Sequence, residues 1–257
     1  MKHFYRIALV FLVLFGSTQM ATTVATEAAL KKAEAALATA EAALEAAKAA
    51  VAEAKVALAG VTTEQWIPLF DSESTAGWSI PVYGGDGEVD VQEGNLVIGR
   101  GEMMTGIRYD KDFPKVNYEI RYEARRTQGY DFFAACTFPV KESFCTFING
   151  GWGGGVTGLS SIDGYDASEN PSSFHFDYRE NAWYRFRIRV TDNAAQIWIT
   201  AQDKEGNWEE EKSFINLDIT DKELSTRMEV DRYKPLGMCT WNTEGQLRSI
   251  EYRVLGK

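Results

Sequence analysis

The residues best suited to chemistry in this sequence surround Trp152. Glycines stand at positions 150, 151, 153, 154 and 155, so the backbone there can turn tightly and approach a ligand closely. An indole presented from such a turn offers a flat face on which a sugar ring can stack. The alternative is that the glycines fit a β-bulge and that the indole packs in the interior. We expect Trp152 to bind substrate.

A group of oxygen-bearing side chains follows Trp152 within one loop. Its members are Ser161, Asp163, Asp166, Glu169 and Asn170. A carboxylate such as Asp163 or Glu169 could act as a general base, with Asp166 and Asn170 as candidates for binding substrate. The same oxygens could instead hold calcium, or close a turn through their own side chains. Calcium takes about six to eight oxygen ligands and no EF-hand spacing is present, so we expect no cofactor and leave calcium open.

Three further candidates stand outside this loop. Asp131 directly precedes the apolar run 132–138 and is a third candidate for the general base. Trp241, near the C-terminus, is expected to line the same cleft as Trp152, Asp163 and Glu169. Arg121 alternates with apolar residues along its strand, which favours a ladder of cross-strand ion pairs on a solvated sheet face. If that face instead lined the cleft, the guanidinium could bind an oxygen of the substrate.

The cysteine and histidine content argues against several kinds of site. The three cysteines match no metal-binding spacing, and His175 is the single histidine beyond residue 25, so neither a zinc cage nor a Ser-His-Asp triad is expected. Cys136 and Cys145 flank a turn near Pro139 and could form a disulfide across a hairpin, the alternative being two buried thiols. Cys239 is expected in the core. The net charge of −10, with no basic segment, argues against a nucleic-acid partner.

The elements that must position these residues are short strands. Beyond Thr63, strand-like runs recur at short intervals, separated by clusters of Gly, Asn, Asp and Pro. Residues 118–124 and 184–190 alternate between apolar and polar side chains, so each of these strands should bury one face. The pattern predicts an all-β fold over residues 64–255, a two-sheet jelly-roll sandwich.

The first 25 residues have the layout of a secretory signal peptide. Lys2 and Arg6 precede the apolar run Ile7–Gly16, and small residues follow it. The run is too short to span a bilayer with ease, since about 20 apolar residues are needed. We therefore expect export to the periplasm or the extracellular space, with attachment to a membrane only if this segment is not cleaved.

Residues 26–61 are rich in alanine and are predicted to form a helix that ends at Gly60. Its larger apolar residues recur every seven positions, at Leu30, Leu37, Leu44, Val51 and Leu58. This heptad pattern favours self-association as a coiled coil. A solvated stalk is the alternative, because an alanine seam buries little apolar area.

Five motifs in order resemble the 3-keto-disaccharide hydrolase domain family. They are WIPLFDSESTAGW at 66–78, EGNLVIG at 93–99, FPKVNYEIRYEAR at 113–125, WYRFRIRV at 183–190 and PLGMCTWNTEGQLRSIEYRVL at 235–255. The resemblance covers about Gln65 to Leu255 and implies a concanavalin-like jelly roll. The segment around residues 145–170 departs from the stretches that many members carry there, which indicates a distinct subgroup.

For function, the resemblance implies cleavage of glycosides already oxidised at C3 of the sugar. A 3-keto group acidifies the hydrogen on C2, and a base can then expel the substituent on C1. Such a site needs a positioned base and an electrophile near the ketone oxygen. The alternatives are a non-catalytic carbohydrate-binding module on a stalk and a structural protein of the cell envelope.

Overall fold

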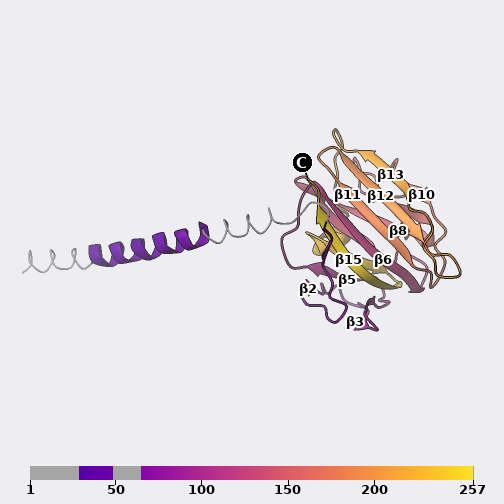
Figure 1. Cartoon of the computed structure of the whole chain (residues 1–257), viewed down its shortest axis with the longest axis horizontal. Coiled ribbons are helices and arrows are strands. Elements are labelled where there is room, and N and C mark those ends of the chain that lie inside the picture. Colours follow the sequence, from indigo (N-terminus) through magenta and orange to yellow (C-terminus); the bar gives the residue numbers. More distant parts are fainter. Residues whose placement is uncertain (1–28, 49–64, 257) are drawn as a thin grey trace, which may run out of the picture. The chain divides into compact units, whose positions relative to one another are not determined.

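The computed structural model describes residues 29–48 and 65–256 of the chain, which divides into two units, Met1–Thr62 and Thr63–Lys257. In the first unit, residues 29–48 form a helix (Figure 1). Leu30, Leu37 and Leu44 are each more than half exposed on it. The predicted signal peptide and the heptad positions Val51 and Leu58 lie outside the described residues. Within the described ranges, no helix is long and apolar enough to cross a bilayer.

The second unit is a sandwich of two antiparallel sheets. Sheet A has eight strands, in the spatial order β13 (Lys212–Asp218), β12 (Ala194–Ala201), β11 (Tyr184–Val190), β6 (Tyr118–Gln128), β15 (Glu244–Val254), β4 (Asn95–Ile98) and β3 (Val89–Gln92), with β1 (Ile67–Pro68) also paired to β15. Sheet B has seven strands, in the order β10 (Phe174–His175), β9 (Val156–Ser160), β8 (Ser143–Gly150), β7 (Ala135–Val140), β14 (Gly237–Trp241), β5 (Met104–Tyr109) and β2 (Trp78–Ser79). Figure 1 shows β11, β12 and β13 of sheet A side by side. The predicted jelly-roll sandwich is confirmed.

The core lies between the sheets and is built by the predicted alternation. On β6, the inward residues are Tyr118, Ile120, Tyr122 and Ala124, all fully buried. On β11, the inward residues are Tyr184, Phe186, Ile188 and Val190, at most 1% exposed. Because successive side chains of a strand point to opposite faces, the arginines and glutamates between them lie on the outer face of sheet A. Burying each large apolar side chain stabilises the sandwich by about 1.5–3 kcal/mol.

The cysteines are buried free thiols, so of the two alternatives considered for Cys136 and Cys145 the buried thiols are present and the disulfide is not. The turn between β7 and β8 is at Lys141 and Glu142, further along the chain than Pro139. In the resulting register Cys136 lies opposite Phe147 and Cys145 lies opposite Phe138, so the two sulfurs do not face each other. Burial raises the pKa of the Cys145 thiol to about 12.

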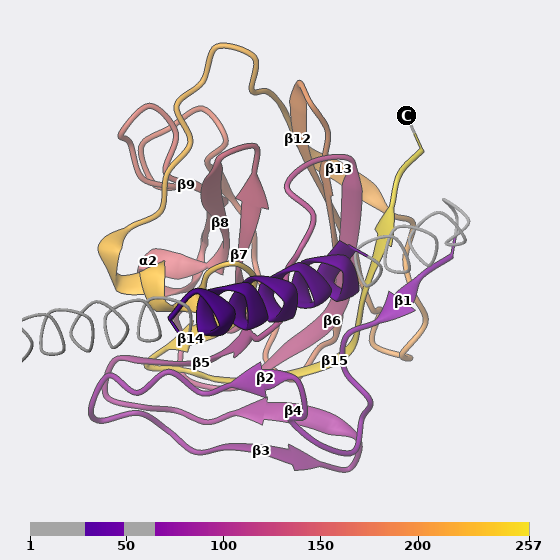
Figure 2. The same cartoon turned by 90° about the vertical axis from the view of Figure 1, so that its left-hand side faces the viewer.

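The outer face of sheet B is covered by a segment that contains the 3₁₀ helix η1 (Met228–Tyr233). Val230 and Tyr233 of η1 pack on Ala135, Ile148 and Cys239 of the sheet. Close packing requires glycine at 237, because a Cβ atom there would lie 2.6 Å from Cβ of Tyr233. Figure 2 shows η1 as a gold helical turn beside the short helix α2 (Gly151–Gly154). These two elements enclose the site described next.

Candidate functional site

A cavity of about 230 Å³ lies at one end of the outer face of sheet B, between the sheet and the elements α2 and η1. Its apolar wall consists of Met104, Phe132, Ile148 and Val230. Two indoles, Trp152 and Trp241, and three charged side chains, Asp131, Arg227 and Glu229, complete the lining. A mostly apolar hollow with a few convergent polar groups is the usual form of a small-molecule site.

Asp131 is held in one orientation by backbone donors. Its Oδ1 atom accepts a hydrogen bond from the backbone N–H of Phe132 at 2.8 Å, and Oδ2 accepts one from the N–H of Gly153 at 2.9 Å. Its own backbone N–H donates to Oγ1 of Thr243 at 3.0 Å. A carboxylate has about four acceptor positions, so each oxygen keeps one for a ligand or a proton.

The donor at Gly153 exists because the chain turns through left-handed conformations at α2. The φ angles are 81° at Gly150, 50° at Trp152, 82° at Gly153 and 113° at Gly154. A Cβ atom at residue 154 would lie 2.7 Å from the carbonyl oxygen of Tyr130, so glycine is required there. Trp152 occupies a conformation that costs a side-chain-bearing residue of order 1–3 kcal/mol. The turn places its indole, 46% exposed, at the mouth of the cavity.

Arg227 is anchored from both sides. Its Nη2 atom donates to Oε1 of Glu229 at 2.9 Å, and Nη1 donates to Oδ2 of Asp166. Asp166 in turn accepts a hydrogen bond from the Ser161 hydroxyl at 3.1 Å. The hydrogen bond from Arg227 lowers the pKa of Glu229, and the same bond raises the pKa of Arg227. The cavity lining therefore contains an anchored guanidinium as well as Asp131.

Three of the sequence-predicted site residues come together here: Asp131, Trp152 and Trp241 all line the cavity. Asp166 does not line it, but contacts Arg227 from outside. Asp163 lies apart from the cavity lining. Its carboxylate accepts hydrogen bonds from Nζ of Lys222 at 2.7 Å and from a backbone N–H, and these bonds lower its pKa.

The remaining candidates lie elsewhere. Glu169 is exposed on the loop. Asn170 is buried, and its Nδ2 atom donates to the carbonyl oxygens of Leu159 at 2.6 Å and Tyr165 at 3.1 Å, so it closes the loop as a turn residue. Arg121 projects from the outer face of sheet A, where it bonds Glu251 at 2.6 Å. The ion-pair ladder considered for that face is therefore present, and this arginine is not part of the cavity.

No cluster of three or more His, Cys, Asp or Glu side chains in the described part of the chain is arranged to hold a metal ion. The expectation of no cofactor, with calcium left open, stays a prediction. His175 is exposed and bonds Asp177 at 2.9 Å.

Sequence reasoning missed Arg227 and Glu229. Both belong to the irregular segment that crosses sheet B, where neither a strand nor a helix period marks a buried face. A pair of opposite charges two residues apart resembles any solvated surface pair. Only the packing of Val230 and Tyr233 on the sheet brings them to the cavity.

Residues 65–224 match the family described as 3-keto-alpha-glucoside-1,2-lyase-like domain. Arg227, Glu229 and Trp241 lie beyond the matched residues. No protein of curated function matches the chain.

Several solved structures resemble the chain at low identity. A glycosyl hydrolase family protein from Mycobacterium fortuitum is 11% identical, with 76% of this chain and 100% of that chain covered and a TM-score of 0.43. The carbohydrate binding module CBM66 from Bacillus subtilis is 10% identical, with 72% and 99% covered and a TM-score of 0.42. The exoplasmic/lumenal domain of VIP36, bound to Ca²⁺ and Man3GlcNAc, is 10% identical, with 77% and 91% covered and a TM-score of 0.49.

Proposed function

The chain belongs to the 3-keto-alpha-glucoside-1,2-lyase-like family, and from this premise we propose that its β-sandwich domain cleaves glycosides that carry a ketone at C3 of the sugar. The cavity that contains Asp131 is the active site in this proposal. The observation that carries it is a carboxylate with fixed orientation that shares one cavity with an anchored guanidinium and two indoles.

The reaction begins with transfer of the C2 proton to a base. The electrons of the C2–H bond then delocalise onto the ketone oxygen as an enolate. When the enolate collapses, the C1–O bond breaks, a double bond forms between C1 and C2, and the departing alkoxide takes up a proton. Addition of water across the double bond completes a net hydrolysis, whereas release of the unsaturated sugar is an elimination.

The charged and aromatic side chains of the cavity each have a role in this reaction. Asp131 takes the C2 proton, because two backbone N–H groups hold its carboxylate in place and acceptor positions remain for the substrate. Arg227 stabilises the negative charge that develops on the C3 oxygen, since Asp166 and Glu229 fix its position before the substrate binds. Trp152 and Trp241 pack against the sugar ring and exclude water.

Asp163 and Glu169 fit the role of the base less well. Asp163 lies outside the cavity and is engaged by Lys222, and Glu169 is exposed on the same loop. A useful base close to neutral pH has to face the substrate in a partly water-free site. Asp131 satisfies this requirement because it is half-buried and lines the cavity.

The test is turnover of 3-keto-trehalose or 3-keto-lactose by the full chain. We expect Asp131→Asn to lower kcat roughly a hundredfold or more, because the amide cannot accept the C2 proton. The matched control is Asp177→Asn, which makes the same change at a carboxylate that is 94% exposed and outside the cavity lining. Both variants should keep the melting temperature of the unaltered chain.

Full activity of Asp131→Asn would contradict the assignment of the base. Loss of turnover in Asp163→Asn or Glu169→Gln, with Asp131→Asn still active, would move the base to the loop 163–169.

A non-catalytic carbohydrate-binding module is the second candidate. The observation that favours it is the pair of indoles in the cavity, since aromatic faces bind sugars without any chemistry. Saturable binding of the keto sugar by calorimetry, with no substrate consumed over hours, would establish this function in place of the first.

A further inference from the structure

The outer face of sheet A carries a cluster of arginines that lie over tryptophans, here called the Arg–Trp face. Its seven arginines are Arg121 and Arg125 on β6, Arg185, Arg187 and Arg189 on β11, and Arg248 and Arg253 on β15. They lie over Trp66, Trp183, Trp198 and Trp208 at 3.8 to 5.3 Å from the ring centroids. Stacking on a ring holds each guanidinium in place and leaves its edge available for hydrogen bonds.

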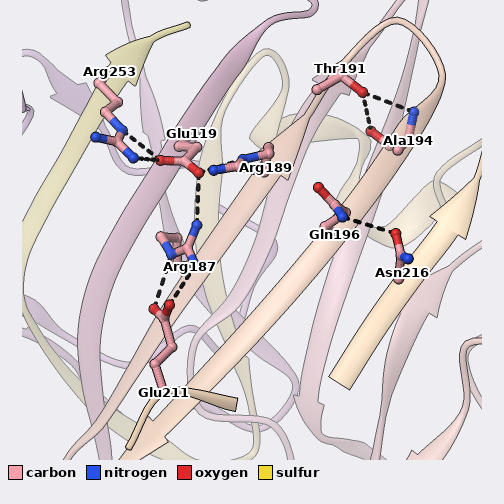
Figure 3. A network of polar contacts seen from close by, with 9 residues as sticks. All are labelled: Glu119, Arg187, Arg189, Thr191, Ala194, Gln196, Glu211, Asn216 and Arg253. Carbon is pink, nitrogen blue, oxygen red and sulfur yellow. Dashed lines mark hydrogen bonds and ion pairs between the residues drawn. The ribbon is translucent and has the colours of Figure 1, made fainter. Parts of the chain in front are cut away.

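Two carboxylates of this face, Glu119 and Glu123, lie deeper than the guanidiniums that pair with them. Glu119 is fully buried and bonds Arg187 at 2.8 Å and Arg189 at 2.6 Å, and Arg253 bonds its other oxygen (Figure 3). Glu123 is 9% exposed and lies between two further arginines of the neighbouring strands, β11 and β15. The paired arginines are between 15% and 37% exposed. At Glu119 and Glu123, positive groups therefore cover negative ones, whereas Glu211 and Glu251 are 37% and 25% exposed.

The charge of this face differs from that of the whole protein. Seven guanidiniums meet four carboxylates, those of Glu119, Glu123, Glu211 and Glu251. The cluster thus has a surplus of three positive charges on a chain whose net charge is −10. A local field of this sign attracts anions while the rest of the surface repels them.

A polar hollow of about 200 Å³ opens within the Arg–Trp face. Arg121, Arg185, Ser249, Glu123 and Glu251 line it. It exists because the pairing of β15 with β6 shifts register between Arg248 and Glu251, which leaves Ser249 exposed in a left-handed conformation, φ 50°. Within the described residues, neither Nη group of Arg121 has a hydrogen-bond partner, and neither does Nη1 of Arg185. The hollow therefore offers both donors and acceptors to a ligand.

We propose that the Arg–Trp face binds an acidic polysaccharide, with a uronate residue in the hollow between Arg121 and Arg185. A uronate has a carboxylate for the guanidiniums and hydroxyl groups that can donate to Glu123 and Glu251, which matches the mixed lining. The further arginines lie on β6, β11 and β15, and adjacent strands are about 4.8 Å apart. This row of arginines can therefore bind neighbouring uronates of the same polymer. This site is separate from the Asp131 cavity and does not depend on its chemistry.

A protein partner fits this face less well. Among the described residues, none of the exposed large hydrophobic side chains belongs to β6, β11 or β15. Protein interfaces usually have an apolar centre with aromatic or methionine side chains that become fully buried. Here the indoles are already covered by guanidiniums.

The experiment measures retardation of the full chain in a native gel that contains polygalacturonate, with neutral dextran as the reference polymer. We expect retardation by polygalacturonate alone, and its loss at high salt. Arg121→Gln/Arg125→Gln should weaken binding about tenfold or more, since it removes charge-assisted hydrogen bonds while leaving the arginines around Glu119 intact. Arg100→Gln/Arg108→Gln is the matched control, with the same change in net charge outside the Arg–Trp face, and should bind like the unaltered chain.

Two further variants keep the test decisive. Arg185→Lys retains the positive charge but not the planar fork, and should weaken binding while keeping the melting temperature, even if the double variant proves unstable. Asp131→Asn should bind polygalacturonate normally, so failure of the catalytic proposal leaves this one untouched. No retardation of the unaltered chain, equal weakening in the control, or equal retardation by a DNA oligonucleotide would overturn the assignment.

Discussion

In the proposed active site, Asp131 and Arg227 are both held in place by neighbouring groups. The carboxylate is oriented by the N–H of Gly153, and the guanidinium is fixed by Asp166 and Glu229. Donors that are already in place before the reaction cost no reorganisation when charge develops, which is why such groups account for much of catalysis. The side chains predicted from the sequence to act as bases on the loop 163–169 have no comparable placement toward the cavity.

We expect Arg227→Gln to lower kcat about a hundredfold or more with a smaller effect on KM, because the guanidinium acts on charge that is present only in the transition state. Its ion pairs are 40% to 45% exposed at Arg227 and Glu229, so stability should change little. Arg232→Gln, on the 3₁₀ helix that follows Arg227 and outside the cavity lining, is the control. Equal kcat in the two variants would remove Arg227 from the mechanism.

At the scale of elements, sheet A is held together by charges on one face and by aromatic packing on the other. Glu119 of β6 links β11 and β15 through three arginines. Burial alone would raise the pKa of Glu119, but hydrogen bonds from Arg189 and Arg253 outweigh it and hold the pKa below its usual range. Removing one member of a buried charge network leaves the others uncompensated.

We therefore expect Glu119→Ala to destabilise the sandwich by about 3–5 kcal/mol, a fall of roughly 10 °C in melting temperature. Glu142→Ala, at a carboxylate 87% exposed, should have almost no effect. A melting temperature within about 2 °C of the unaltered chain for Glu119→Ala would show that the network adds little.

The stability of the sandwich at acid pH should depend on the same ion-pair network around Glu119. Since the pKa of Glu119 is lower in the folded than in the unfolded chain, its contribution to stability is present above the unfolded value of about 4.3 and is lost as the pH falls through the folded value. The contribution of Glu119 to the free energy of unfolding should therefore be nearly constant between pH 7 and pH 5. It should be lost only below about pH 4. Urea unfolding at a series of pH values measures this, and Glu119→Gln should flatten the acid limb.

At the scale of the whole molecule, the chain combines an alanine-rich helix with a carbohydrate-related sandwich. Three leucines at heptad spacing, Leu30, Leu37 and Leu44, are exposed on the described part of the helix. Exposed apolar residues in a regular seam are typical of helices that pair with other helices. Export and the predicted signal peptide stay predictions, which fractionation of cells expressing the full gene would test.

We expect the chain to sediment as an oligomer, and Leu30→Glu/Leu37→Glu/Leu44→Glu to convert it to a monomer because charges cannot be buried in the seam. The melting temperature of the sandwich should not change, since the substitutions lie in the other unit. If the unaltered chain is a monomer, the prediction of self-association is wrong and the alternative of a solvated stalk remains.

The sequence by itself determined the features that depend on local geometry. The alternation at 118–124 and 184–190 follows from the period of a strand, and both buried faces are those predicted. The glycines around Trp152 form the predicted tight turn. Local pattern also indicated an ion-pair ladder at Arg121, and the ordered motifs indicated the family.

Tertiary structure decided which of these residues meet. Asp131 is positioned by Thr243, 112 residues away, and Arg227 reaches the cavity only through the packing of η1 on sheet B. The hairpin register that separates Cys136 from Cys145 depends on where the turn falls. Such contacts join segments that are far apart in the sequence and at no regular spacing. No local pattern therefore predicts them. The physical reason is that a strand's side-chain alternation is a property of its backbone, whereas a cavity is a property of how whole sheets and loops pack.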